Sequence, residues 1–150
     1  MAGASTLSEE ETYRAIGRFI FEFSQLEHTL KICVAKAAGI KDEFFAAVMS
    51  QDFALLCTMA LVILPSALQS QKPGNIDHVI NECRRLNDER VRVVHGLWTP
   101  QKRGGTVAHV SRTKLKPTFS RWQAGHLEKQ ADIARKLSTT VWGLAYPITR

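Results

Sequence analysis

The feature that most constrains the fold is a long stripe of apolar residues near the N-terminus. Apolar side chains recur there at steps of three and four residues, at Ile16, Phe19, Ile20, Phe23, Leu26, Leu30, Cys33, Val34 and Ala37. This spacing places them on one side of an α-helix, and that side must pack against the rest of the chain. Ser8 and Glu11 have the spacing of a capping box, and Gly39 is a typical helix stop. The pattern therefore predicts a long amphipathic first helix.

Weaker patterns predict three further helical segments. A short helix is expected from Asp42 to Met49 and an apolar helix over residues 53–70. Polar residues and Pro65 interrupt the apolar run of residues 53–70, so its uninterrupted part is shorter than the roughly 20 residues that a membrane-spanning helix needs. This segment therefore predicts a buried central helix. An amphipathic helix is expected from Asn75 to Gly96, with its core positions at Ile76, Val79, Ile80, Cys83, Leu86, Val91 and Val94.

The periodicity changes from helical to alternating after Gly96. The following run, LWTPQKRGGTVAHVSRTKL, has Gly104 and Gly105 between two strand-like halves. Alternation around a glycine turn is typical of a β-hairpin, and Pro117 is expected to end it.

A second capping-box spacing, Ser120 with Gln123, predicts that the last helix runs from about Arg121 to Leu144. Its expected core positions are Trp122, Leu127, Ile133, Leu137, Val141, Trp142 and Leu144. The sequence thus predicts an all-α fold, an antiparallel bundle of four long helices plus a short helix, with one β-hairpin inserted before the last helix. One domain is expected over residues 1–150.

Composition favours a soluble cytoplasmic protein without a cofactor. Apolar residues make up 45% of the chain and charged residues 23%, as in ordinary globular domains. Cys33, Cys57 and Cys83 lie too far apart for the close cysteine pairs of metal sites or disulfide scaffolds. The acidic start lacks the pattern of a secretory signal. Zinc-protease and nucleotide-loop motifs are absent from the sequence, so we expect no metal and no cofactor.

The positive charge of the chain is confined to one segment. Between Arg90 and Leu127 there are eight Lys and Arg residues and no Asp or Glu. The other 12 Lys and Arg residues face 14 Asp and Glu residues, so the net charge of +6 comes entirely from this segment. Such a segment attracts polyanions, with nucleic acid the commonest candidate. A solvated basic loop without a ligand explains the same pattern equally well.

Arg90 and His95 stand where this segment meets the end of the third long helix. Histidine can transfer a proton near neutral pH, and arginine can hold a phosphate through paired hydrogen bonds. RNA cleavage by internal transfer needs both functions. On a regular helix, side chains five residues apart point about 140° away from each other. They can act together only if the helix end unwinds at Gly96 or if a second molecule completes the site.

The stretch LNDERVRVVHG resembles the HEPN superfamily, whose members carry an arginine, four to six residues and a histidine late in a helix. The first helix, IGRFIFEFSQLEHTL, is similar to that of bacterial members. The resemblance implies a metal-independent endoribonuclease that works as a homodimer. We expect a toxin or defence component with an antitoxin or companion protein. It implies that Arg90 stabilises the phosphate and His95 transfers the proton. Arg92 and Glu27 are candidate supporting residues.

The basic segment predicts the RNA-binding residues, which are Arg92, Lys102, Arg103, Arg112, Lys114 and Lys116. Trp98, Phe119 and Trp122 flank it and could stack on bases, although we expect at least two of them to pack in the core. The other histidines, His28, His78, His109 and His126, are interpreted as structural or surface residues.

Two alternatives to an enzyme stay open. Val91 follows Arg90 where the HEPN family usually has a polar residue, often asparagine. This departure favours a non-catalytic helical module that binds RNA or a protein. A purely structural helical domain, in which Arg90 makes an exposed ion pair and His95 caps the helix, explains the same residues.

Overall fold

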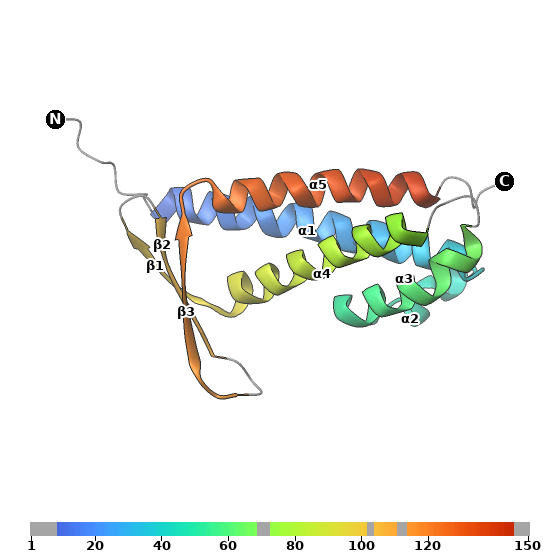
Figure 1. Ribbon diagram of the computed structural model, residues 1–150, viewed down its shortest axis with the longest axis horizontal. Coiled ribbons are helices and arrows are strands. Elements are labelled where there is room, and N and C mark those ends of the chain that lie inside the picture. Colours follow the sequence, from blue (N-terminus) through green and yellow to red (C-terminus); the bar gives the residue numbers. More distant parts are fainter. Residues whose placement is uncertain (1–8, 69–72, 102–103, 111–113, 146–150) are drawn as a thin grey trace.

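The computed structural model describes residues 9–68, 73–101, 104–110 and 114–145. The chain is mostly helical, with a small antiparallel sheet before the last helix (Figure 1). In chain order the elements are α1 (Glu9–Ala37), the 3-10 turn η1 (Asp42–Phe44), α2 (Phe45–Val48), α3 (Phe53–Ala67), α4 (Pro73–His95), β1 (Leu97–Gln101), β2 (Gly104–Val110), β3 (Pro117–Gln123) and α5 (His126–Ala145).

The two helices with the most extensive mutual contact, α1 and α5, run in the same direction. Near the start of both helices Arg18 forms an ion pair with Asp132, and farther along the Thr29 and Ser138 hydroxyls lie 3.1 Å apart. Figure 1 shows the two helices side by side along the molecule. This differs from the antiparallel arrangement that the sequence predicts throughout. The reason is the segment with η1 and α2, which returns the chain toward the middle of α1 before α3 begins.

Helix α4 runs against α5, as the predicted antiparallel bundle requires. Arg85 Nη1 donates a hydrogen bond to Gln130 Oε1 at 2.9 Å, and one turn farther Glu89 meets His126. Because residue numbers rise on α4 while they fall on α5, the two helices are antiparallel. The C-terminal end of α4 therefore reaches the N-terminal end of α5, with the sheet beside both (Figure 1).

The predicted stripe on α1 is the centre of the core. Six of its nine positions are buried, and Ile16, Ile20 and Ala37 pack against the core from its edge. Phe23 meets Phe53 at the start of α3 with ring centroids 4.8 Å apart.

Five positions of α3 are buried, but Leu55 and Val62 are 47% and 73% exposed, so α3 is only partly buried and differs from the buried central helix that the sequence predicts. No helix among the described residues is long and apolar enough to span a membrane.

Near the sheet, the buried side of α4 differs from the prediction. Val93 is buried, whereas Val94 is 48% exposed and Val91 is half-buried. The cause is a change of partner, because at this end α4 faces the sheet, where Val93 lines a small cavity with Trp98 and Val107. On α5, Trp142 is likewise 43% exposed, which differs from its predicted core position.

The sheet has three strands in the order β1-β2-β3, so the predicted hairpin is only part of it. Pro117 begins β3 and does not end the sheet, and Arg121 lies opposite Thr106 of β2. The predicted helix start at Ser120 and Gln123 is therefore wrong. Backbone pairing with β2 outweighs the local capping pattern, and Gly125, with φ at +83°, makes the turn into α5.

One face of the sheet packs on the helices through two tryptophans. Trp122 is buried and meets Trp98 edge-to-face, with ring centroids 5.1 Å apart. Trp98 Nε1 donates a hydrogen bond to the Val93 carbonyl at 3.0 Å, which satisfies an acceptor in the last turn of α4. On the other face, Leu97 and Phe119 are 73% and 74% exposed. The prediction that at least two of the three flanking aromatics pack in the core is confirmed.

Candidate functional site

Arg90 lies on the side of α4 that faces α1. Its guanidinium carbon is 5.5 Å from the centroid of the Phe23 ring, a cation–π distance, and Nη2 donates to Asn87 Oδ1 at 3.4 Å. Nε is buried without a hydrogen-bond partner. Arg90 is therefore half-buried against an aromatic ring, and among the described residues it forms no ion pair and its Nε has no acceptor.

His95 is the last residue of α4 and is exposed. Within the part of the chain that the structure describes, its imidazole has no hydrogen bond or ion pair. Helix α4 continues without a break from Pro73 to His95, so its end does not unwind to bring His95 back toward Arg90. Of the two ways in which these side chains could converge, only a second molecule remains compatible with this geometry.

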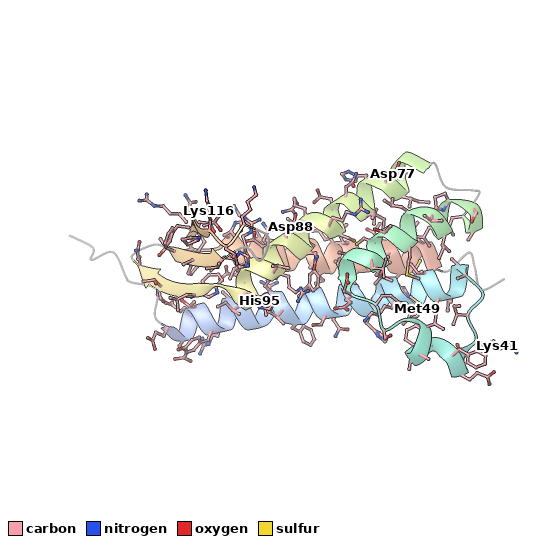
Figure 2. All side chains as sticks on the ribbon, turned by 90° about the horizontal axis from the view of Figure 1, so that it is seen from below. Lys41, Met49, Asp77, Asp88, His95 and Lys116 are labelled. Atoms are coloured by element: carbon pink, nitrogen blue, oxygen red, sulfur yellow. The ribbon has the colours of Figure 1, made fainter. Side chains whose placement is uncertain are left out.

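Three of the predicted RNA-binding residues can be located. Arg92 is exposed on the last turns of α4, and Lys114 and Lys116 are exposed in the connection between β2 and β3. Figure 2 shows Lys116 and His95 at the same end of the molecule, far from Lys41 and Met49. Arg121, which the prediction omitted, adds an exposed cation on β3. Lys102, Arg103 and Arg112 lie outside the described residues.

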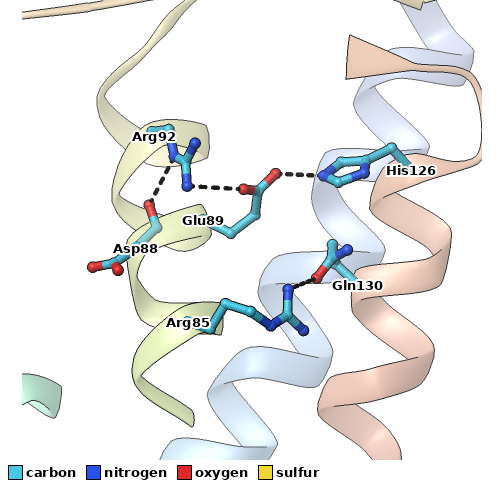
Figure 3. Close-up of polar contacts among 6 residues, drawn as sticks. All are labelled: Arg85, Asp88, Glu89, Arg92, His126 and Gln130. Carbon is cyan, nitrogen blue, oxygen red and sulfur yellow. Dashed lines mark hydrogen bonds and ion pairs between the residues drawn. The ribbon is translucent and has the colours of Figure 1, made fainter. Parts of the chain in front are cut away.

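A polar cluster that the sequence did not reveal connects α4 with α5 at this end. Glu89 Oε1 is 2.7 Å from His126 Nε2, and Glu89 Oε2 is 3.5 Å from Arg92 Nη2 (Figure 3). Arg92 Nε also donates to the Asp88 carbonyl at 3.4 Å. The Glu89 side chain is only 18% exposed, against 38% for His126 and 47% for Arg92. One half-buried carboxylate therefore holds a histidine and an arginine within a single chain.

Two adjoining pockets open beside this cluster. The first, of about 150 Å³, lies between α4, α5 and the sheet, and Glu89, Arg92 and Trp98 are among its lining residues. The second, of about 280 Å³, has Lys129 and Gln123 in its wall. The two pockets share three lining residues, Arg121, Trp122 and His126. Cationic and imidazole groups thus surround a concave surface of a size suited to a small polar group.

Sequence patterns could not reveal the Glu89–His126 pair, because the two residues are 37 positions apart on different helices. His126 was interpreted as structural for lack of a neighbouring partner. The one available signal was the position of Glu89, which is the last acidic residue before the acid-free segment and adjoins Arg90. The candidate supporting residue Glu27 pairs with Lys31 one turn away on α1, at 2.9 Å.

A larger pocket, of about 450 Å³, lies away from the sheet. Its lining is mostly apolar and comes from α1, from α5 and from the segment between α1 and α3. His28 borders it and meets the Phe45 ring edge-on at 6.2 Å. No group of three or more metal-ligating side chains occurs among the described residues.

Comparisons with known proteins add no relative: the chain matches no family model, no curated protein and no solved structure.

Proposed function

We propose that this chain is a metal-independent endoribonuclease of HEPN type that acts as a homodimer. The observation that carries the proposal is the exposed imidazole of His95, which ends α4 and has no partner among the described residues. Lys116 is exposed at the same end of the molecule (Figure 2). An imidazole free of other bonds can give or take a proton at a bound phosphodiester. RNA is the proposed substrate because the adjoining segment carries no acidic residue.

Arg90 would supply the positive charge in this reaction. Its stacking on Phe23 holds the guanidinium plane in one orientation. A cation fixed in place before the reaction stabilises the charge of a pentacoordinate phosphate better than a flexible one.

The homodimer is part of the proposal because one chain cannot bring the two groups together. Arg90 and His95 point about 140° apart on an unbroken helix. A second α4 crossing the first could place the Arg90 of one chain near the His95 of the other. We further propose that α1, α3, α4 and α5 form a HEPN-type four-helix bundle. A role as a toxin or defence component, with an antitoxin or companion protein, is the proposed biological setting.

Cleavage of single-stranded RNA in the presence of EDTA tests this function. The wild type should cut, and His95→Ala should lower the rate by about 10²-fold or more, because proton transfer is lost. Arg90→Ala should have an effect of similar size. His78→Ala is the matched control, because His78 is an exposed histidine near the other end of the same helix.

Circular dichroism melting of each variant separates lost chemistry from lost folding, which matters for Arg90 because of its contact with Phe23. The ribonuclease proposal fails if the wild type does not cut RNA, or if His95→Ala cuts as fast as His78→Ala.

A non-catalytic RNA-binding module is the second candidate, and the packing of Arg90 favours it. The contacts with Phe23 and Asn87 give this arginine a structural role, and Val91 departs from the family pattern. In that case RNA would bind without being cut, with an affinity that falls steeply with salt because phosphate contacts release counterions. Replacing Lys114, Lys116 and Arg121 by alanine should then reduce both the affinity and its dependence on salt.

A further inference from the structure

The Glu89–His126 pair fixes an imidazole at the mouth of the two pockets beside the sheet. Figure 3 shows His126 on α5 facing Glu89 on α4, with Arg92 on the other side of the same carboxylate. Glu89 accepts from one ring nitrogen of His126, which orients the ring. The second nitrogen has no partner among the described residues, and it can donate to an anion when the ring is protonated. With 38% of its side chain exposed, His126 is accessible from the pockets that it lines.

The charge around these pockets is positive. Arg92 and Arg121 line the first pocket and Arg121 and Lys129 the second, whereas Glu89 is the only acidic residue in either lining. The carboxylate of Glu89 is already shared between Arg92 and His126. Apart from Glu89, no carboxylate of the described residues lines either pocket, so the remaining donors of Arg92 and those of Arg121 and Lys129 are available to an anionic group.

Arg121 lines both pockets and, by the alternation of β3, also lies on the face of the sheet that carries Phe119. Arg121 is exposed on β3, two residues after Phe119, whose ring is 74% exposed on the outer face of the sheet. Lys116 is exposed just before β3. Exposed aromatic rings between cations bind unstacked bases and their phosphates without sequence preference. The position of Arg121 favours a phosphate that belongs to a single strand over a free anion.

We propose that Arg92, Arg121, His126 and Lys129 form a phosphate-binding subsite for single-stranded RNA within a single chain. The subsite is distinct from the Arg90 and His95 pair. It holds a backbone phosphate of the strand while Glu89 positions His126. This inference builds on the proposed function, because it supplies the contacts that position the RNA that Arg90 and His95 would cut.

Binding of an uncleavable strand tests the subsite independently of catalysis. The probe is a single-stranded oligonucleotide with 2′-O-methyl groups, which lacks the hydroxyl needed for internal transfer. Titration into the full chain labelled with ¹⁵N should shift the imidazole signals of His126 in NMR spectra, and leave those of His78 unchanged. Arg92→Ala and Arg121→Ala should each weaken binding about tenfold or more, because a hydrogen bond to a charged group is lost.

Lys136→Ala is the matched control, since Lys136 is an exposed cation on α5 that lines neither pocket. Arg92→Lys and Arg121→Lys should recover part of the affinity by keeping the charge. Glu89→Gln should change the His126 signals even without ligand, because a positioning partner is altered.

Two results would overturn the proposal. The first is a titration in which the His126 signals stay in place, or in which the Arg92 and Arg121 variants bind as well as Lys136→Ala. The second is inorganic phosphate that binds as tightly as the oligonucleotide, since the site would then be one for a free anion. If RNA cleavage is never observed while the His126 signals shift, the ribonuclease proposal fails and the subsite stands.

Discussion

At the scale of single residues, the three cysteines are buried thiols. Cys33, Cys57 and Cys83 are fully buried and free, and burial raises the pKa of Cys33 and Cys57 to about 11. For Cys83 the pKa is raised to about 12, chiefly by burial and further by the neighbouring Cys57 and Glu82. A thiol with a raised pKa stays protonated and reacts slowly with electrophiles, so these cysteines serve packing.

The raised pKa of Cys83 makes the fold less stable in alkali. Between the ordinary value of 9.0 and about 12, the folded chain keeps a proton that the unfolded chain releases. The free energy of unfolding should therefore be undiminished below pH 9 and fall as the pH rises above it, by about 1 kcal/mol at pH 10.

Urea unfolding at pH 8, 9 and 10 measures this loss. Cys83→Ala will be less stable at every pH because it leaves a cavity, but its stability should fall less between pH 8 and pH 10 than that of the wild type. Equal slopes for both proteins would show that Cys83 does not titrate in this way.

At the scale of elements, the junction of α4 and β1 depends on a glycine for reasons of space. A Cβ on Gly96 would lie 2.2 Å from Val107 Cγ1 and 2.4 Å from the Arg92 carbonyl oxygen. The sequence suggested conformational freedom as the role of this glycine. The structure replaces that reason with close packing, because Gly96 is not among the residues with positive φ.

Gly96→Ala should destabilise the fold by about 1–3 kcal/mol, since the helix carbonyl cannot move aside. Gly17→Ala is the matched control: Gly17 lies within α1, and a Cβ there would meet nothing within 4 Å. Alanine should stabilise that helix by about 0.5–1 kcal/mol. Chemical denaturation of both variants gives the comparison, and a Gly96→Ala protein as stable as the wild type would contradict the packing argument.

An element could be predicted from the sequence where local spacing determines it, and could not where contacts between distant segments hold it in place. The apolar stripe of α1 is a property of local spacing, and its positions are in the core as predicted. Strand β3 is held by distant pairing with β2, so Ser120 and Gln123 could imitate a helix start. The candidate site divides in the same way: Arg90 and His95 form a local motif, whereas Glu89 and His126 meet only because α4 and α5 pack together.

At the scale of the whole molecule, the proposed ribonuclease requires two chains. If the Arg90 of one chain acts with the His95 of the other, then a mixture of Arg90→Ala and His95→Ala chains should regain activity, because each mixed dimer contains one intact pair. A chain that carries both Arg90→Ala and His95→Ala, mixed with wild type, should give no more activity than the wild-type chains give alone. Sedimentation analysis must show exchange of chains, and a mixture that stays inactive despite exchange would contradict a shared site.

Because the tryptophans lie at two ends of the molecule, their fluorescence can report on each end separately. Trp98 and Trp122 are in edge contact beneath the sheet, whereas Trp142 lies on the last turns of α5, away from the sheet, and is 43% exposed. Indole emission shifts to longer wavelength when water reaches the ring, so the two ends should emit differently. In a Trp142→Phe chain all fluorescence would come from the sheet end. Local opening of the sheet could then be followed separately from unfolding of the helices, without an added dye.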